Sequence, residues 1–165
     1  MRSRISLWLK ALLSAFVAPG TVLGLAPGLL LSDGRGRVPD SLGFLEVLAL
    51  ALAAAGTALY SVCLATFFHV GHGTPAPVDP PTSLVAIGPY RDVRNPMYLA
   101  VAAIVAAEAL LFRSAAMLAY GGILFAAFHA FVVLYEEPTL HSRFGDSYDR
   151  YRSRVPRYLP RRARA

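Results

Sequence analysis

Apolar residues along the chain gather into four long tracts, which are separated by short polar stretches. The tracts cover residues 5–31, 42–70, 97–112 and 114–135. A helix needs roughly 17–25 apolar residues to cross a bilayer. The first, second and fourth tracts reach that length, and the third approaches it if its helix runs from Pro96 to Arg113. The pattern therefore predicts an all-α, polytopic membrane protein with about four transmembrane helices.

The composition favours a membrane protein over a soluble helical bundle. Mean hydropathy is +0.50, and only 16% of the 165 residues are charged. Helices of a soluble bundle carry a polar face, whereas these tracts barely do. We expect a single membrane domain over residues 1–165.

Basic residues indicate how the chain is oriented in the membrane. They concentrate before the first tract, between the second and third (Arg91 and Arg94), and after the fourth. With four spans these regions share one side, which the positive-inside rule assigns to the cytoplasm. We therefore predict a multi-pass protein of the plasma or inner membrane with both termini cytoplasmic. A basic tail beside a membrane contacts anionic headgroups more simply than nucleic acid, so no nucleic-acid partner is expected.

Two cytoplasmic segments connect or follow the predicted helices. Residues 71–96 hold six of the twelve prolines and form a long, rigid loop. After the fourth tract, Phe144, Tyr148, Tyr151 and Val155 recur at the spacing of one helical face. This amphipathic C-terminal helix either lies in the membrane interface or caps the bundle.

The stretch "GPYRDVRNPMYLA", residues 88–100, carries more polar chemistry than a turn requires. Asn95 and Pro96 are a favoured N-cap and first helical residue. The helix that starts there directs its free N–H groups toward the loop, where an anion can bind. Arg94 adds positive charge, and Tyr90 and Tyr98 add rings and hydroxyls. The stretch either binds a ligand that has a carboxylate or phosphate and a flat ring, or anchors the chain at the interface.

A pair of acidic residues, Glu136 and Glu137, follows the fourth tract. At the C-terminal end of a helix this pair opposes the helix dipole. We expect a cation to compensate it, from Arg94, from the C-terminal arginines or from a ligand. Because the third and fourth tracts form an antiparallel hairpin, the acidic pair and the Asn95-Pro96 helix start should face one cavity.

Taken together, "LVAIGPYRDVRNPMY", a membrane hairpin and "EEP…FGDSYDRYRSRVPRYLP" make the chain similar to a known family over about residues 71–160. They resemble the integral-membrane methyltransferases related to isoprenylcysteine carboxyl methyltransferase and phospholipid N-methyltransferase. Isoprenylcysteine enzymes typically read His-Pro-x-Tyr where this chain has Asn95-Pro96-Met97-Tyr98, and phospholipid N-methyltransferases read Asn-Pro-Met-Tyr. The arginine that the eukaryotic carboxyl methyltransferases place shortly before their glutamates is also missing, which argues against a prenylcysteine carboxylate as substrate.

The resemblance implies a cytoplasmic pocket for S-adenosyl-L-methionine with a lateral opening for a lipid. Carried over by motif, the residues that line this cofactor pocket are Leu84, Val85, Tyr90, Arg94, Asn95, Pro96, Met97, Tyr98, Glu136 and Glu137.

The implied reaction is methyl transfer to a lipid-like or apolar small molecule, with no metal. An amine acceptor needs a base, for which Glu136 is the first candidate and His129 the second. Two alternatives remain open at this point: a membrane reductase of sterol-reductase-like architecture that uses NADPH, and a non-catalytic protein that keeps the pocket. The sequence identifies neither the acceptor nor the oligomeric state.

Overall fold

The computed structural model describes residues 19–32, 34, 36–37, 39–67 and 83–160, and its elements there are all helical. The predicted all-α class is therefore confirmed for these residues. The first half of the first predicted helix and the proline-rich residues 68–82 lie outside them. The elements are η1 (Thr21–Leu25), α2 (Ala26–Ser32), α3 (Phe44–Thr66), η3 (Gly88–Arg91), α4 (Pro96–Leu111), α5 (Ala115–Phe131), η4 (Val132–Glu136), α6 (Glu137–Phe144) and α7 (Asp146–Arg154).

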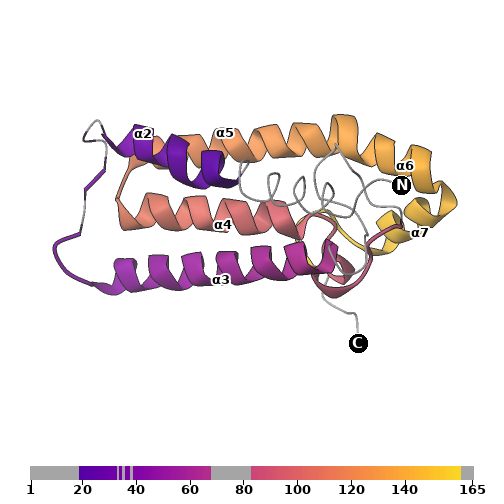
Figure 1. The fold of residues 1–165 in the computed structure, drawn as a ribbon, viewed down its shortest axis with the longest axis horizontal. Coiled ribbons are helices and arrows are strands. Elements are labelled where there is room, and N and C mark those ends of the chain that lie inside the picture. Colours follow the sequence, from indigo (N-terminus) through magenta and orange to yellow (C-terminus); the bar gives the residue numbers. More distant parts are fainter. Residues whose placement is uncertain (1–18, 33, 35, 38, 68–82, 161–165) are drawn as a thin grey trace, which may run out of the picture.

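Helix α4 lies between α3 and α5, and α2 runs along α5 (Figure 1). Small side chains allow this close packing. Ala100 is fully buried, and a Cβ atom at Gly56 of α3 would lie only 3.0 Å from the Ala100 carbonyl oxygen. Farther along α4, Val105 and Ala109 pack against Met117 of α5. The bundle therefore places its most buried helix at the centre, and no other described residues cover the outer faces of α3 and α5.

Those outer faces are apolar. Phe44 of α3 and Ile123 of α5 are 81% and 72% exposed, which is unfavourable in water and suits contact with lipid. Two helical runs, Phe44–Thr66 and Ala115–Phe144, are long and apolar enough to cross a membrane. The run Thr21–Ser32 and helix α4 are apolar but shorter. The count of four transmembrane helices therefore stays a prediction.

The turn between α4 and α5 covers residues 112–114, at the junction of the third and fourth apolar tracts, as the predicted hairpin requires. Arg113 has a positive φ of 48°, and the Ser114 hydroxyl caps α5 by accepting a hydrogen bond from the Met117 amide. Arg113 also reaches α3, where its Nη2 lies 2.7 Å from Oε1 of the buried Glu46. The turn makes α4 and α5 antiparallel, so the start of α4 lies at the same end as the residues that follow α5.

The helix that begins at Ala115 does not end before the two glutamates. It continues through the π turn η4 and through α6 to Phe144, so the prediction that Glu136 and Glu137 lie at a helix C-terminus is wrong. Pro138 has no amide hydrogen and normally clashes with the carbonyl four residues earlier. The wider π turn, closed by the Glu137 amide on the Val132 carbonyl, accommodates this proline without ending the helix.

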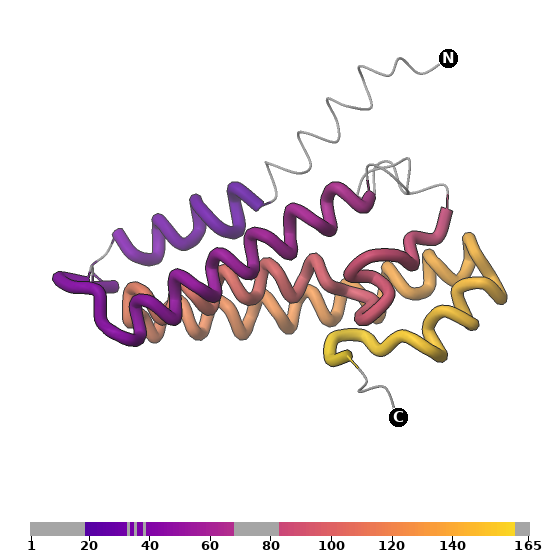
Figure 2. Tube along the Cα trace, turned by 90° about the horizontal axis from the view of Figure 1, so that it is seen from below, coloured from indigo at the N-terminus to yellow at the C-terminus, as the bar shows by residue number. Residues whose placement is uncertain are grey.

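The chain reverses at Gly145, whose φ of 48° and ψ of −128° suit glycine. Helix α7 and residues 155–160 then return toward the loop that precedes α4 (Figure 2). Tyr148 is fully buried and Val155 nearly so, and the Tyr151 hydroxyl donates to the Tyr90 carbonyl at 2.6 Å. Of the two positions expected for the C-terminal helix, these contacts favour the one that caps the bundle.

Candidate functional site

The start of α4 and the acidic pair are direct neighbours, as the hairpin predicts. The Tyr98 hydroxyl donates to Glu136 Oε2 at 3.1 Å, and Arg94 Nη1 lies 3.0 Å from Glu137 Oε1. These four residues come from two segments about forty positions apart in the sequence. The fold thus gathers opposite charges and a phenol at one end of the bundle.

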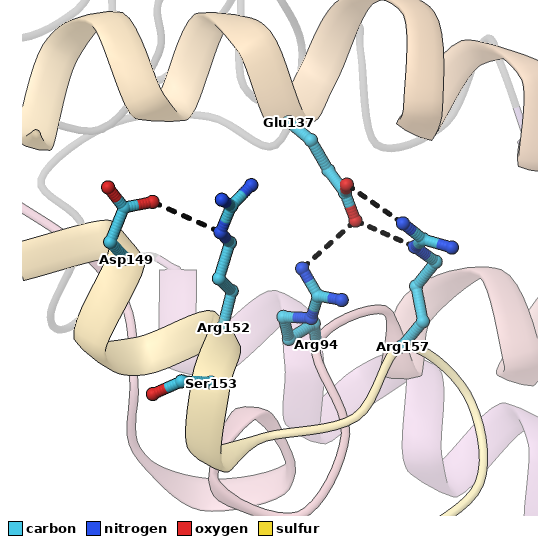
Figure 3. A pocket seen from close by; sticks show the side chains of 6 residues that line it. All are labelled: Arg94, Glu137, Asp149, Arg152, Ser153 and Arg157. Carbon is cyan, nitrogen blue, oxygen red and sulfur yellow. Dashed lines mark hydrogen bonds and ion pairs between the residues drawn. The ribbon is translucent and has the colours of Figure 1, made fainter.

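Two arginines hold the Glu137 carboxylate (Figure 3). Arg157 donates through Nε to Oε1 at 2.7 Å and through Nη2 to Oε2 at 3.0 Å, while Arg94 binds Oε1. The hydrogen bond with Glu137 raises the pKa of the Arg157 guanidinium above its ordinary value, so two positive charges face one negative charge. Arg94 and the C-terminal arginines were both expected as compensating cations. In the structure, Arg94 and the C-terminal Arg157 compensate the charge of Glu137.

Asn95 lies at the N-cap position, but its side chain makes no capping hydrogen bond. Its Nδ2 donates instead to the Arg157 carbonyl at 3.3 Å. The main-chain amides of Arg94 and Asn95 donate to the carbonyls of Pro156 and Arg157 at 2.8 and 3.2 Å. The predicted N-cap Asn95 and first helical residue Pro96 are therefore confirmed, but the amides of Arg94 and Asn95 are not free for an anion because the C-terminal segment supplies acceptors.

Part of the predicted pocket lining lies in a hydrophobic cluster. Val85 and Tyr90 are buried with Cys63 of α3, and Met97 packs against them. Burial raises the pKa of the Tyr90 hydroxyl, so this group stays neutral. Leu84 is half-buried and Pro96 is buried. This cluster anchors the loop to α3 and thereby fixes the start of α4, and a role for these residues in cofactor binding stays a prediction.

His129, the second candidate base, lies on the exposed side of α5. Its Nδ1 is 3.1 Å from the Tyr158 hydroxyl, and the two ring centroids are 5.8 Å apart. Phe125 also packs against Tyr158, with ring centroids 5.2 Å apart. The ring of Tyr98, in contrast, packs against Phe128 of α5, with ring centroids 4.7 Å apart. The two candidate bases thus have different tyrosine partners.

An open hollow of about 580 Å³ lies beside the Glu137 ion pairs. Its walls come from the loop before α4, from α6 and α7, and from the C-terminal segment. The lining residues, all labelled in Figure 3, are Arg94, Glu137, Asp149, Arg152, Ser153 and Arg157. Arg152 Nε also pairs with Asp149 Oδ1 at 3.0 Å. Three arginines against two carboxylates leave the hollow with one excess positive charge. Its volume falls within the range of small-molecule sites, about 300–1,000 Å³.

Four of these lining residues, Asp149, Arg152, Ser153 and Arg157, were not among the predicted site residues. The sequence signal that could have indicated Arg157 is "VPRYLP", in which two prolines flank Arg157 and favour an extended segment.

In the described part of the chain, no group of three or more His, Cys, Asp or Glu side chains could hold a metal ion.

The fold and site define a helical membrane protein with a charged site at one end of an α4–α5 hairpin. The family model of phospholipid methyltransferases matches residues 46–147. Because this match covers more than half of the chain, the protein belongs to the phospholipid methyltransferase family, which confirms the predicted relationship and makes it a membrane methyltransferase by family. The match includes Arg94, Tyr98 and the glutamate pair, and ends before Arg157. A comparison with curated proteins finds no match.

Proposed function

We propose that this protein transfers a methyl group from S-adenosyl-L-methionine to a lipid-like or apolar small molecule at the cytoplasmic face of the membrane. The proposal includes four transmembrane helices, with both termini and residues 71–96 in the cytoplasm. Family membership supports methyl transfer and favours it over the NADPH-dependent reductase.

The observation that carries the proposal is the contact between the α4 start and the acidic pair. S-Adenosyl-L-methionine has a carboxylate, an ammonium, a ribose diol and a sulfonium, so its site needs anionic and cationic partners within the length of one small molecule. Arg94 and Glu136 come from segments that meet through the Arg94–Glu137 and Tyr98–Glu136 bonds. Arg94 also has a buried Nε that finds no acceptor among the described residues. The donor set therefore fits this cofactor.

The two glutamates have different roles in this proposal. Glu137 is already bonded to the guanidinium groups of Arg94 and Arg157, so it holds Arg94 in place for the carboxylate of the ligand. Glu136 accepts a hydrogen bond from Tyr98, and it makes no ion pair within the described residues. Its negative charge remains available for the ammonium, the diol or the sulfonium.

When bound, S-adenosyl-L-methionine supplies an electrophilic methyl group. The chain contributes chiefly by positioning the reactants and excluding water. A carboxylate or phenolate acceptor requires no base. An amine acceptor must lose a proton, and the Glu136 carboxylate is the first candidate to take it, with His129 as the second. The excess positive charge of the hollow lined by Arg94, Arg152 and Arg157 suits an anionic group on either ligand.

Isothermal titration of the purified protein with S-adenosylhomocysteine tests the proposal. NADPH, titrated under the same conditions, is the matched comparison. We expect saturable binding of S-adenosylhomocysteine and none of NADPH. Binding of NADPH alone would support the reductase, and binding of neither compound in several lipid environments would count against any methyltransferase site.

A further inference from the structure

The C-terminal strap, which we define as residues 155–158, runs beside the two residues that precede α4. The amides of Arg94 and Asn95 donate to the carbonyls of Pro156 and Arg157 at 2.8 and 3.2 Å. Val155, at the beginning of the strap, is buried. These main-chain bonds and this apolar contact attach the strap to the bundle independently of the Arg157 side chain.

The Arg157 side chain has a separate geometric effect. It binds both oxygens of Glu137 at once, at 2.7 and 3.0 Å, and so fixes the plane of that carboxylate. Glu137 Oε1 in turn binds Arg94, whose side chain is only 12% exposed. Arg94 Nη1 also lies 3.3 Å from the hydroxyl of the buried Tyr148. Arg157 therefore orients Glu137 and, through it, contributes with Tyr148 to the orientation of Arg94.

We propose that Arg157 is a positioning residue for the methyl-transfer site: it acts on the bound cofactor through Glu137 and Arg94. This inference rests on the function proposed above. It assigns a role to a residue outside the segment that the family model matches. It also gives the two arginines different roles, because Arg157 binds both oxygens of Glu137 whereas Arg94 binds one of them.

Titration with S-adenosylhomocysteine separates positioning from folding. Loss of folded protein lowers the binding stoichiometry and leaves the Kd of the remaining sites unchanged, whereas misplacement of Glu137 and Arg94 raises the Kd. We expect Arg157→Ala to raise the Kd by about 10–100-fold, the scale on which partners that orient metal ligands affect metal affinity. Arg157→Lys should recover part of this loss, since lysine supplies charge but not the bidentate fork.

Arg154→Ala is the matched control, because it removes an exposed arginine from the end of α7. It should bind like the wild type. If Arg157→Ala fails to fold, the Arg157→Lys variant and the double variant Glu137→Gln/Arg157→Gln replace it. The double variant should bind no more weakly than Glu137→Gln alone, because Arg157 acts through Glu137.

An unchanged Kd in Arg157→Ala, or a loss confined to stoichiometry, would overturn the inference while the wild type still binds. A double variant that binds much more weakly than Glu137→Gln would also contradict it. A wild-type protein that does not bind S-adenosylhomocysteine would refute the proposed function, and the inference with it.

Discussion

The proposed function assigns the Glu136 carboxylate to the cofactor, and the Tyr98 hydroxyl donates a hydrogen bond to that carboxylate. Tyr98→Phe removes the hydroxyl and keeps the ring, including its packing on Phe128 at 4.7 Å. A hydrogen bond to a charged group contributes about 1.5–3 kcal/mol. At 3.1 Å this bond is longer than the strongest O–H···O⁻ bonds, so we use the lower value. Because this bond lies within the protein, only the part of its contribution that differs between the free and the bound state changes the binding constant. The whole of about 1.5 kcal/mol would correspond to roughly tenfold.

We therefore expect Tyr98→Phe to raise the Kd for S-adenosylhomocysteine measurably, by up to about tenfold, in isothermal titration. Tyr135→Phe is the matched control, because Tyr135 precedes Glu136 in sequence and is 47% exposed. Its hydroxyl should not affect binding. Equal affinities for Tyr98→Phe and the wild type, or an equal loss in Tyr135→Phe, would refute the assignment of Glu136 to the cofactor.

Three further predictions concern the scaffold and are measured by unfolding in detergent. Gly56→Ala should lower the free energy of unfolding by about 1 kcal/mol. The added Cβ atom would lie 2.9–3.0 Å from atoms of α4, and such overpacking costs about 1–3 kcal/mol. The higher helix propensity of alanine offsets about 1 kcal/mol of this cost. Gly122→Ala, with nothing within 4 Å, should not destabilise, and equal losses at both sites would contradict the packing account. Gly145→Ala should cost about 1–3 kcal/mol through its left-handed backbone alone, and a neutral result would show that the α6–α7 reversal tolerates a Cβ. Arg113→Gln should lower the thermal unfolding midpoint by leaving the buried Glu46 carboxylate unpaired, and an unchanged midpoint would show that this ion pair contributes nothing.

The sequence predicts the helices and their hairpin well, because both depend on local rules. The lengths of the apolar tracts place α3, α4 and α5 within a few residues, and the Phe112–Ser114 turn makes α4 and α5 antiparallel. From that geometry alone, Arg94 and Tyr98 must lie near the two glutamates. The contacts at 3.0 and 3.1 Å confirm this expectation.

The features that the sequence did not predict depend on non-local contacts or on exceptions to local rules. A proline usually ends a helix, but the π turn before Pro138 lets the helix continue. The amides of Arg94 and Asn95 find their acceptors in residues 156–157, about sixty positions away. No local pattern identifies such a pairing, so the role that we propose for Arg157 is argued from the structure alone.

Measurement of turnover decides whether the protein is a methyltransferase. Membranes that contain the wild-type protein are incubated with methyl-labelled S-adenosyl-L-methionine, and the lipid extract is analysed by mass spectrometry. Glu136→Gln membranes and membranes without the protein are the controls. We expect a labelled lipid-like product with the wild type and a greatly reduced amount with Glu136→Gln. No labelled product from a wild-type protein that binds S-adenosylhomocysteine would contradict the claim and identify a protein that keeps the pocket without catalysis.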